Sequence, residues 1–145
     1  MTQTMTKLTL VAPITGRLVQ PANSDVAGFA IIPDDGNAVV PVSGTVTEVD
    51  AEALRIVIAT REGLEVTVAL NQSRLQLGIQ PCEALVQVGN YVKAGQVLAA
   101  IDMVAIQRLK ASIRVLTTIA PMPDNLEMIK TNRDVKVDTA IARLY

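Results

Sequence analysis

Short runs in which hydrophobic and polar residues alternate are the main pattern of the chain, and the clearest two surround one turn. Arg55–Ala59 and Glu65–Leu70 alternate with a period of two on either side of Glu62 and Gly63. A period of two places successive side chains on opposite faces of a strand, and Gly accepts the positive φ that a tight turn requires. This segment therefore predicts an antiparallel hairpin.

The same pattern recurs along the chain, with Val, Ile, Leu and Thr between turn-forming Gly, Pro, Asn and Asp. It predicts an all-β fold of antiparallel strands, each half buried. The expected strands are Leu8–Ala12, Gly16–Gln20, Phe29–Ile32, Ala38–Pro41, Thr45–Val49, Arg55–Ala59, Glu65–Leu70, Ala84–Val88, Val97–Ile101, Ile113–Thr118 and Thr139–Leu144.

Two stretches favour short helices instead. Asp102–Ser112 places Met103, Ile106 and Leu109 at helical spacing behind an aspartate that is able to cap the first turn. Pro123–Asn132 has an Asp or Asn cap and apolar residues three apart, which predicts a turn or two of helix. One or two short helices are therefore expected beside the strands.

Two faint internal repeats run through the chain. "APITGRLVQ", from Ala12, resembles "VPVSGTVTEV", from Val40, and "VKAGQVLAAI", from Val92, resembles "VKVDTAIARL", from Val135. Short β-rich segments also resemble one another by chance, but two repeats of different kinds together favour a duplication. We therefore expect a sandwich or barrel built from two similar halves.

Composition limits the classes of function. The chain has 145 residues, half of them hydrophobic, so a single domain over residues 1–145 is expected. Thirteen basic and fourteen acidic residues give a net charge of −1, which gives no electrostatic reason to expect nucleic acid or an anionic membrane as partner. The longest apolar runs fall short of the roughly 18 residues of a membrane span, and the first residues lack the features of a secretion signal. We expect a cytoplasmic protein without membrane insertion.

The chain contains no histidine and one cysteine. Without imidazole it lacks the usual general base near neutral pH, the commonest metal ligand and the phosphohistidine carrier. Cys82 is expected to be a small buried hydrophobic residue, because a reactive thiol needs a neighbouring base. Asp34 and Asp35 are adjacent, so their side chains diverge instead of converging on one ion. We expect neither a metal site nor a cofactor.

The spacing of Pro, Gly and Val in the repeats also occurs in biotinyl and lipoyl carrier domains, but the order differs and the "IDMVAI" that follows the second motif has no lysine to modify. Over nearly its full length the chain instead resembles the glucose-type enzyme IIA (EIIA) domain of the bacterial phosphoenolpyruvate-dependent sugar phosphotransferase system. The matching segments occur in the family's order: "APITGRLV", "GFAIIPDDGNAVVPVSGTVTEV", "REGLEVTVAL", "VQVGNYVKAGQVLAAIDMVAIQRLKASIRVLTTI" and "DVKVDTAIARLY". This resemblance implies an antiparallel β-sandwich or barrel of the duplicated hybrid type (barrel-sandwich).

The resemblance also implies where the active site would be. Family members carry an assisting histidine on one strand and, on the strand after the turn, a histidine that accepts phosphate from the carrier protein HPr. These positions correspond to Leu54 and Ala69, and nearby family glycines and an aspartate correspond to Val57, Asn71 and Ser73. The former active face is thus expected to include these five residues, although Asn71 and Ser73 also suit a turn, as Asp102 suits a helix cap.

We therefore expect a non-catalytic EIIA homologue that binds or regulates a protein partner: a phosphotransferase-system component, a permease or another regulator. Two alternatives remain open at this point. The chain takes part in the phosphoryl relay through another residue, or it is a structural subunit without a ligand. Oligomeric state is not predicted.

Overall fold

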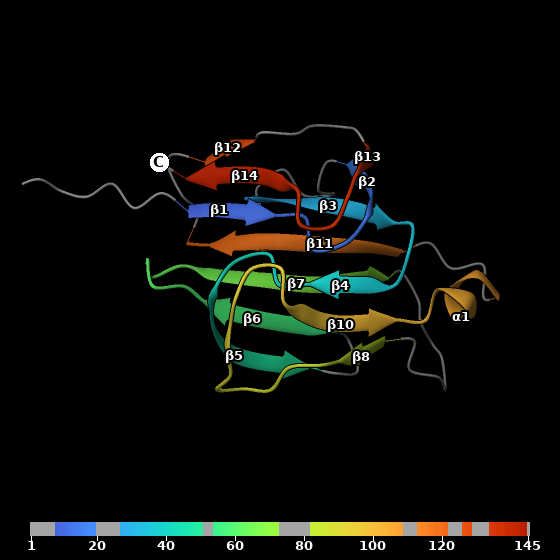
Figure 1. Cartoon of the computed structure of the whole chain (residues 1–145), viewed down its shortest axis with the longest axis horizontal. Helices are drawn as coiled ribbons and strands as arrows, with labels where there is room; N and C mark the ends of the chain where they lie inside the picture. Colours follow the sequence, from blue (N-terminus) through green and yellow to red (C-terminus); the bar gives the residue numbers. More distant parts are fainter. Residues whose placement is uncertain are drawn as a thin grey trace, which may run out of the picture.

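A computed structural model describes residues 8–19, 27–50, 54–72, 82–108, 113–121, 126–128 and 134–144. Within these residues the chain forms strands β1 to β14 and one short helix, α1 (Met103–Arg108). The strands lie in two layers (Figure 1). This arrangement confirms the predicted antiparallel β-sandwich.

One layer is an eight-stranded sheet in which every strand is antiparallel to its neighbours. The order across the sheet is β13 (Asp134–Val135), β2 (Gly16–Val19), β3 (Gly28–Pro33), β11 (Ile113–Ala120), β7 (Glu65–Gln72), β6 (Arg55–Ala59), β5 (Gly44–Asp50) and β9 (Tyr91–Val92).

The other layer consists of two three-stranded sheets. One has the order β1 (Leu8–Val11), β14 (Ala140–Leu144), β12 (Leu126–Met128), and the other has the order β4 (Asn37–Val39), β10 (Val97–Ile101), β8 (Cys82–Ala84). Two reciprocal backbone hydrogen bonds link them: Val11 N donates to Pro41 O at 3.0 Å, and Val39 N donates to Pro13 O at 2.7 Å. The second layer is thus continuous across its centre.

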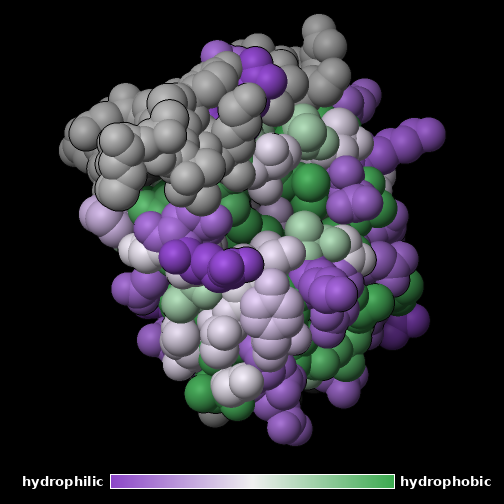
Figure 2. Space-filling view, turned by 60° about the vertical axis from the view of Figure 1, so that its left-hand side comes forward, coloured by the Kyte–Doolittle hydropathy of each residue, from purple (hydrophilic) through white to green (hydrophobic). Residues whose placement is uncertain are grey.

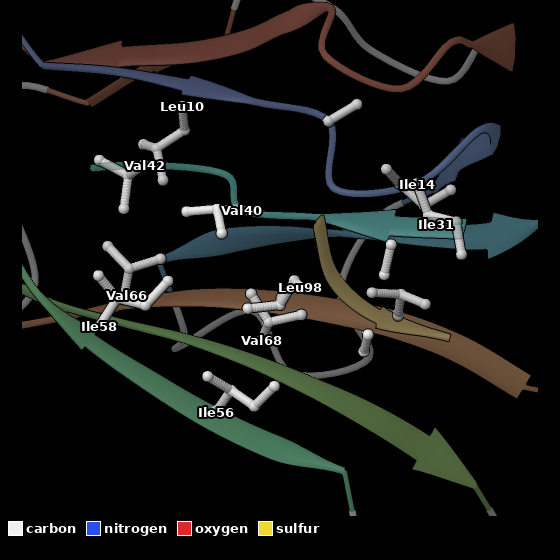
Figure 3. Packing of buried hydrophobic residues seen from close by; sticks show 14 of the residues in the cluster. Leu10, Ile14, Ile31, Val40, Val42, Ile56, Ile58, Val66, Val68 and Leu98 are labelled. Carbon is white, nitrogen blue, oxygen red and sulfur yellow. The ribbon is translucent and has the colours of Figure 1, made fainter. Parts of the chain in front are cut away.

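The hydrophobic core fills the space between the two layers (Figure 3). Val40, Val42 and Leu98 point from one layer towards Ile56 and Val68 of the other, and each is at most 1 % exposed. Burying one such side chain stabilises a fold by about 1.5–3 kcal/mol. The alternation seen in the sequence therefore reflects one face of each strand turned to this core.

The strand order reveals a duplication in which one half is contiguous and the other is split. Residues 37–101 supply β4 to β10, whereas the other half consists of β1 to β3 followed, much later in the chain, by β11 to β14. Read in turn, β1, β2, β3, β11, β12, β13 and β14 occupy the places of β4, β5, β6, β7, β8, β9 and β10. The large sheet therefore has a pseudo-two-fold axis between β11 and β7.

Matching hydrogen bonds confirm that the sequence repeats are structural repeats. The Thr15 hydroxyl accepts a bond from Val137 N at 2.9 Å, and the Ser43 hydroxyl accepts the corresponding bond from Ala94 N at 3.0 Å. The following residues, Gly16 and its counterpart in the second repeat, both lie where a Cβ would collide with a carbonyl oxygen of the neighbouring strand. The predicted duplication is thus correct.

One predicted helix is confirmed over Met103–Arg108, with residues 109–112 of its predicted range outside the described residues, and one is wrong. Asp102 Oδ1 accepts a hydrogen bond from Ala105 N at 3.1 Å, so this aspartate caps α1 as expected. Within the predicted helix Pro123–Asn132, however, Leu126–Met128 form strand β12, because this segment pairs with β14. An ion pair of 2.8 Å between Glu127 and Arg143 joins the two strands. The rest of that predicted helix lies outside the described residues.

Thr117 is a polar residue in the centre of the core. It is 0 % exposed, and its hydroxyl has no hydrogen-bond partner in the part of the chain that the structure describes. The bond from Ile119 N to Ala27 O, 2.9 Å, matches that from Leu70 N to Leu54 O, 3.0 Å, on the other side of the axis. Thr117 therefore occupies the place that Val68 occupies in the other half.

Replacing Thr117 with Val should raise the free energy of unfolding by about 1 kcal/mol, because it removes a buried hydroxyl without a partner and keeps the side-chain shape. The reverse change at the equivalent position, Val68→Thr, is the matched control and should lower it by a similar amount. Urea denaturation measures both. A less stable Thr117→Val protein would show that the hydroxyl is satisfied in solution.

Candidate functional site

The face of the large sheet that points away from the core carries the positions named by the family resemblance. Along β7, Val66, Val68 and Leu70 are buried in the core, so Thr67 and Ala69 lie on the opposite, outer face. Both of these outward residues are partly exposed. Ala69 is therefore at the surface, near the middle of the eight-stranded sheet.

The strand register identifies the neighbours of Ala69. Leu116 of β11 lies directly opposite on one side, and Arg55 of β6 lies opposite on the other. The next position along β7 on the same face is Thr67, which pairs with Thr118. The surface around Ala69 thus consists of a small methyl group, a leucine, two hydroxyls and an arginine.

Arg55 was not anticipated from the sequence. Its Nε lies 3.2 Å from Glu48 Oε2 of β5, and both side chains are about half exposed. An exposed ion pair of this kind contributes at most about 1 kcal/mol. Counting the hairpin register outward from the turn at Glu62 and Gly63 is the signal that would have found Arg55, because it places Arg55 opposite Ala69.

Leu54 does not lie on this surface. It is 1 % exposed and belongs to the hydrophobic core, while its carbonyl accepts the hydrogen bond from Leu70 N. Its φ of 41° is in the left-handed region, which costs a non-glycine residue about 1–2 kcal/mol. The expectation that Leu54 belongs to the former active face is corrected, because its side chain is buried in the core. The free energy gained by this burial offsets the backbone cost.

Val57 is turned to the outer face but is only 4 % exposed. It lies opposite Thr67 on one side and opposite Glu48 on the other, and its carbonyl accepts a hydrogen bond of 3.4 Å from the Thr47 hydroxyl. Val57 therefore adds packing beneath the surface more than contact area.

The last two predicted residues follow Ala69 along the chain. Asn71 belongs to β7 and pairs with Arg114 of β11. Ser73 lies outside the described residues. The structure thus brings Ala69 and Val57 to one face of the sheet and places Leu54 in the core.

Other reactive groups are poorly placed for catalysis. Cys82 is 5 % exposed, and burial raises the pKa of its thiol, so the protonated form is favoured. The prediction of a buried hydrophobic cysteine is confirmed. Across the described ranges no group of three or more Cys, Asp or Glu side chains is arranged to hold a metal ion.

Two further observations bear on how the protein could contact a partner or a membrane. On the side shown in Figure 2, hydrophobic residues reach the surface in separate groups between hydrophilic ones. Among the described residues, no helix has the length and apolar character needed to cross a membrane.

Comparison with known proteins identifies the family. Residues 8–124 match the family model for the phosphoenolpyruvate-dependent sugar phosphotransferase system, EIIA 1. The solved structure of glucose permease IIA from Mycoplasma capricolum superimposes with a TM-score of 0.82 over 100 % of both chains at 21 % identity, which shows the same fold.

Curated relatives agree with this match. The glucose-specific EIIA component of Bacillus cereus is 30 % identical over 132 residues, which are 85 % of this chain and 79 % of the relative. The glucose-specific EIICBA component of Streptococcus pneumoniae is 33 % identical over 119 residues, 81 % of this chain but 16 % of that protein. A lactose permease of Lactobacillus delbrueckii is 28 % identical over 77 % of this chain and 19 % of its own length. With a family model that matches most of its length, the chain belongs to the glucose-type EIIA family of the phosphoenolpyruvate-dependent sugar phosphotransferase system.

Proposed function

We propose that this chain is a non-catalytic member of the EIIA family that acts as a protein-binding or regulatory module. The observation that carries the proposal is the side chain at the family's phosphate-accepting position, Ala69, in a chain without any histidine. A methyl group has no lone pair with which to attack phosphorus, so phosphoryl transfer has no acceptor there.

The nearby hydroxyls are poor substitutes for imidazole. Thr67 and Thr118 face each other on the outer surface beside Ala69. Attack by a hydroxyl on a phosphoryl group needs a general base to remove the proton, and the usual base is histidine. The Cys82 thiol is buried and favoured in its protonated form. A relay through these residues is therefore the weaker alternative.

The relatives indicate the class of partner. The names of two of them are those of an EIICBA component and a lactose permease, in which the matched part is 16 % and 19 % of the whole protein. In this proposal the chain, acting as one domain over residues 1–145 in the cytoplasm, binds a phosphotransferase-system component, a sugar permease or a regulator. It needs no cofactor.

The binding surface in this proposal is the outer face of the large sheet around Ala69. Leu116 and Ala69 lie side by side across β11 and β7 and are partly exposed, while Val57 lies on the neighbouring strand β6, opposite Thr67, and is buried. Uncharged, apolar side chains at the centre of a surface suit contact with another protein, because the buried core of an interface is depleted in charged residues. A structural subunit without a partner at this face is the remaining alternative, and the binding measurement on Ala69→Asp tests it.

Incubation of the chain with phosphoenolpyruvate, enzyme I and HPr should add no phosphoryl group, because the acceptor side chain is absent. Intact mass spectrometry measures the addition, with a histidine-containing glucose-type EIIA in the same mixture as positive control. Stoichiometric phosphorylation of this chain would overturn the proposal, and mapping of the modified residue would identify the relay.

Substitution of Ala69 with Asp should weaken binding to the partner at least tenfold, because it buries a charge at the centre of the proposed contact. Surface-immobilised chain, probed with HPr and with a detergent-solubilised sugar permease, provides the measurement. Val88→Asp is the matched control, since Val88 is 62 % exposed and lies outside the large sheet. If both variants bind like the original chain, this face is not the interface.

Restoring histidines at the two family positions should not restore phosphotransfer. Leu54→His places an imidazole in the apolar core and should lower the free energy of unfolding by about 3 kcal/mol, whereas Ala69→His at the surface should change it little. Thermal denaturation and the phosphotransfer assay, applied to the single and double variants, test this. A stable double variant that accepts phosphate would show that the lost histidines alone account for inactivity.

A further inference from the structure

Three arginines lie on the outer face of the large sheet, on strands near Ala69. Arg17 is on β2, Arg114 is on β11 and Arg55 is on β6. The adjoining residues in each strand belong to the core: Leu18, Val115 and Ile56. Because side chains alternate along a strand, the three arginines share the outer face and form what we call the arginine band.

The register shows how the arginine band crosses the sheet. Arg55 lies opposite Ala69 and Arg114 lies opposite Asn71, so these two arginines flank β7 from the strands on either side. Arg17 lies opposite Ile32 of β3. From β2 to β6 there are four steps between neighbouring strands, which at the usual spacing amount to about 19 Å.

The guanidinium groups of the band have few internal partners. Among the residues that the structure describes, the one ion pair of Arg55 is the exposed pair from its Nε to Glu48. Arg17 and Arg114 form no ion pair with any residue that the structure describes. Exposed pairs contribute little, so an outside anion competes readily with Glu48 for Arg55. The band is thus available to a negatively charged ligand.

Acidic residues border the band instead of lying within it. On the outer face of the five strands from β2 to β6, the only acidic residue among those described is Glu65, at the far end of β7 opposite Ala59. The neighbouring strands carry Glu48 and Asp50 on β5 and Asp134 on β13. Asp50 lies directly opposite Arg55 and Asp134 directly opposite Arg17, so carboxylates border the band at both of its ends. A polyanion longer than the band, such as nucleic acid, would have to cross these carboxylates, whereas a segment no longer than the band is wide fits between them.

An apolar position lies inside the band. Ile32 is 38 % exposed and lies opposite Arg17 of β2. On its other side is β11, in which Val115 pairs with Ile31 and is followed backwards along the strand by Arg114. An isoleucine side chain is therefore exposed between two arginines. The complementary surface carries carboxylates on either side of an apolar group.

We propose that the arginine band docks a short acidic segment of the chain's protein partner, about six extended residues long, whose face towards the sheet carries carboxylates on either side of an apolar side chain. The length follows from the 19 Å width and about 3.3 Å per extended residue. Guanidinium groups bind carboxylates through paired N–H···O hydrogen bonds. The inference rests on the proposed function, since it names the chemistry of the partner at the same face.

Fluorescence anisotropy tests this with a labelled peptide of repeating Glu-Glu-Leu sequence and a Gln-Gln-Leu peptide of equal length. The acidic peptide should bind, more weakly as salt is raised, and the neutral peptide should not. Arg114→Gln and Arg55→Gln should each weaken binding about three- to fivefold. Arg61→Gln, an exposed arginine in the β6–β7 turn with the same change in charge, is the control and should have no effect.

Three results would overturn the inference: no binding of the acidic peptide, equal binding of the neutral one, or equal weakening by Arg61→Gln. Each leaves the phosphotransfer assay unaffected. Conversely, phosphorylation of the chain would refute the non-catalytic proposal while leaving peptide binding to be judged on its own result. The two failures are thus distinguishable.

Discussion

β7 and β11 pair in antiparallel register over eight residues, from Glu65 opposite Ala120 to Gln72 opposite Ile113. This pairing joins the contiguous half of the molecule to the split half, since the pseudo-two-fold axis passes between the two strands. A shift of one residue would turn Val66, Val68 and Leu70 out of the core. The sandwich therefore depends on this one register, which places every other strand of the large sheet.

The same register determines which positions face the core and which face outward, where the side chain is free to vary. Apart from Thr117, the inward positions of the central strands are apolar in both halves, whereas the outward positions hold an alanine, threonines, a leucine and arginines. The two residues proposed to stand at the family's histidine positions are compatible with the scaffold, because Ala69 is outside the core and Leu54 adds to it. A scaffold of this kind keeps its fold while its face acquires a different chemistry.

Much of the fold was predictable, because the alternation of hydrophobic and polar residues indicates a strand with one buried face. β6 and β10 have the predicted bounds, while β9 and β13, two residues each, are too short to show a period. Leu126–Met128 was predicted as helix from a possible cap and the spacing of its apolar residues. It forms a strand because it pairs with β14, and local sequence does not encode that pairing. At the site, alternation placed Ala69 outward, but the burial of Leu54 depends on a φ of 41° that no pattern signals.

The split duplication bears on how the chain folds during synthesis. The contiguous half, residues 37–101, contains all the strands of one repeat and can begin pairing as soon as it leaves the ribosome. The other half has to wait, because β1 pairs only with β14 among the described strands, with Leu8 opposite Leu144. β2 and β3 can pair with each other, but β1 remains without its partner until β14 (Ala140–Leu144) has been made. During that interval the finished half offers β7 as a ready edge on which β11 and then β3 can assemble.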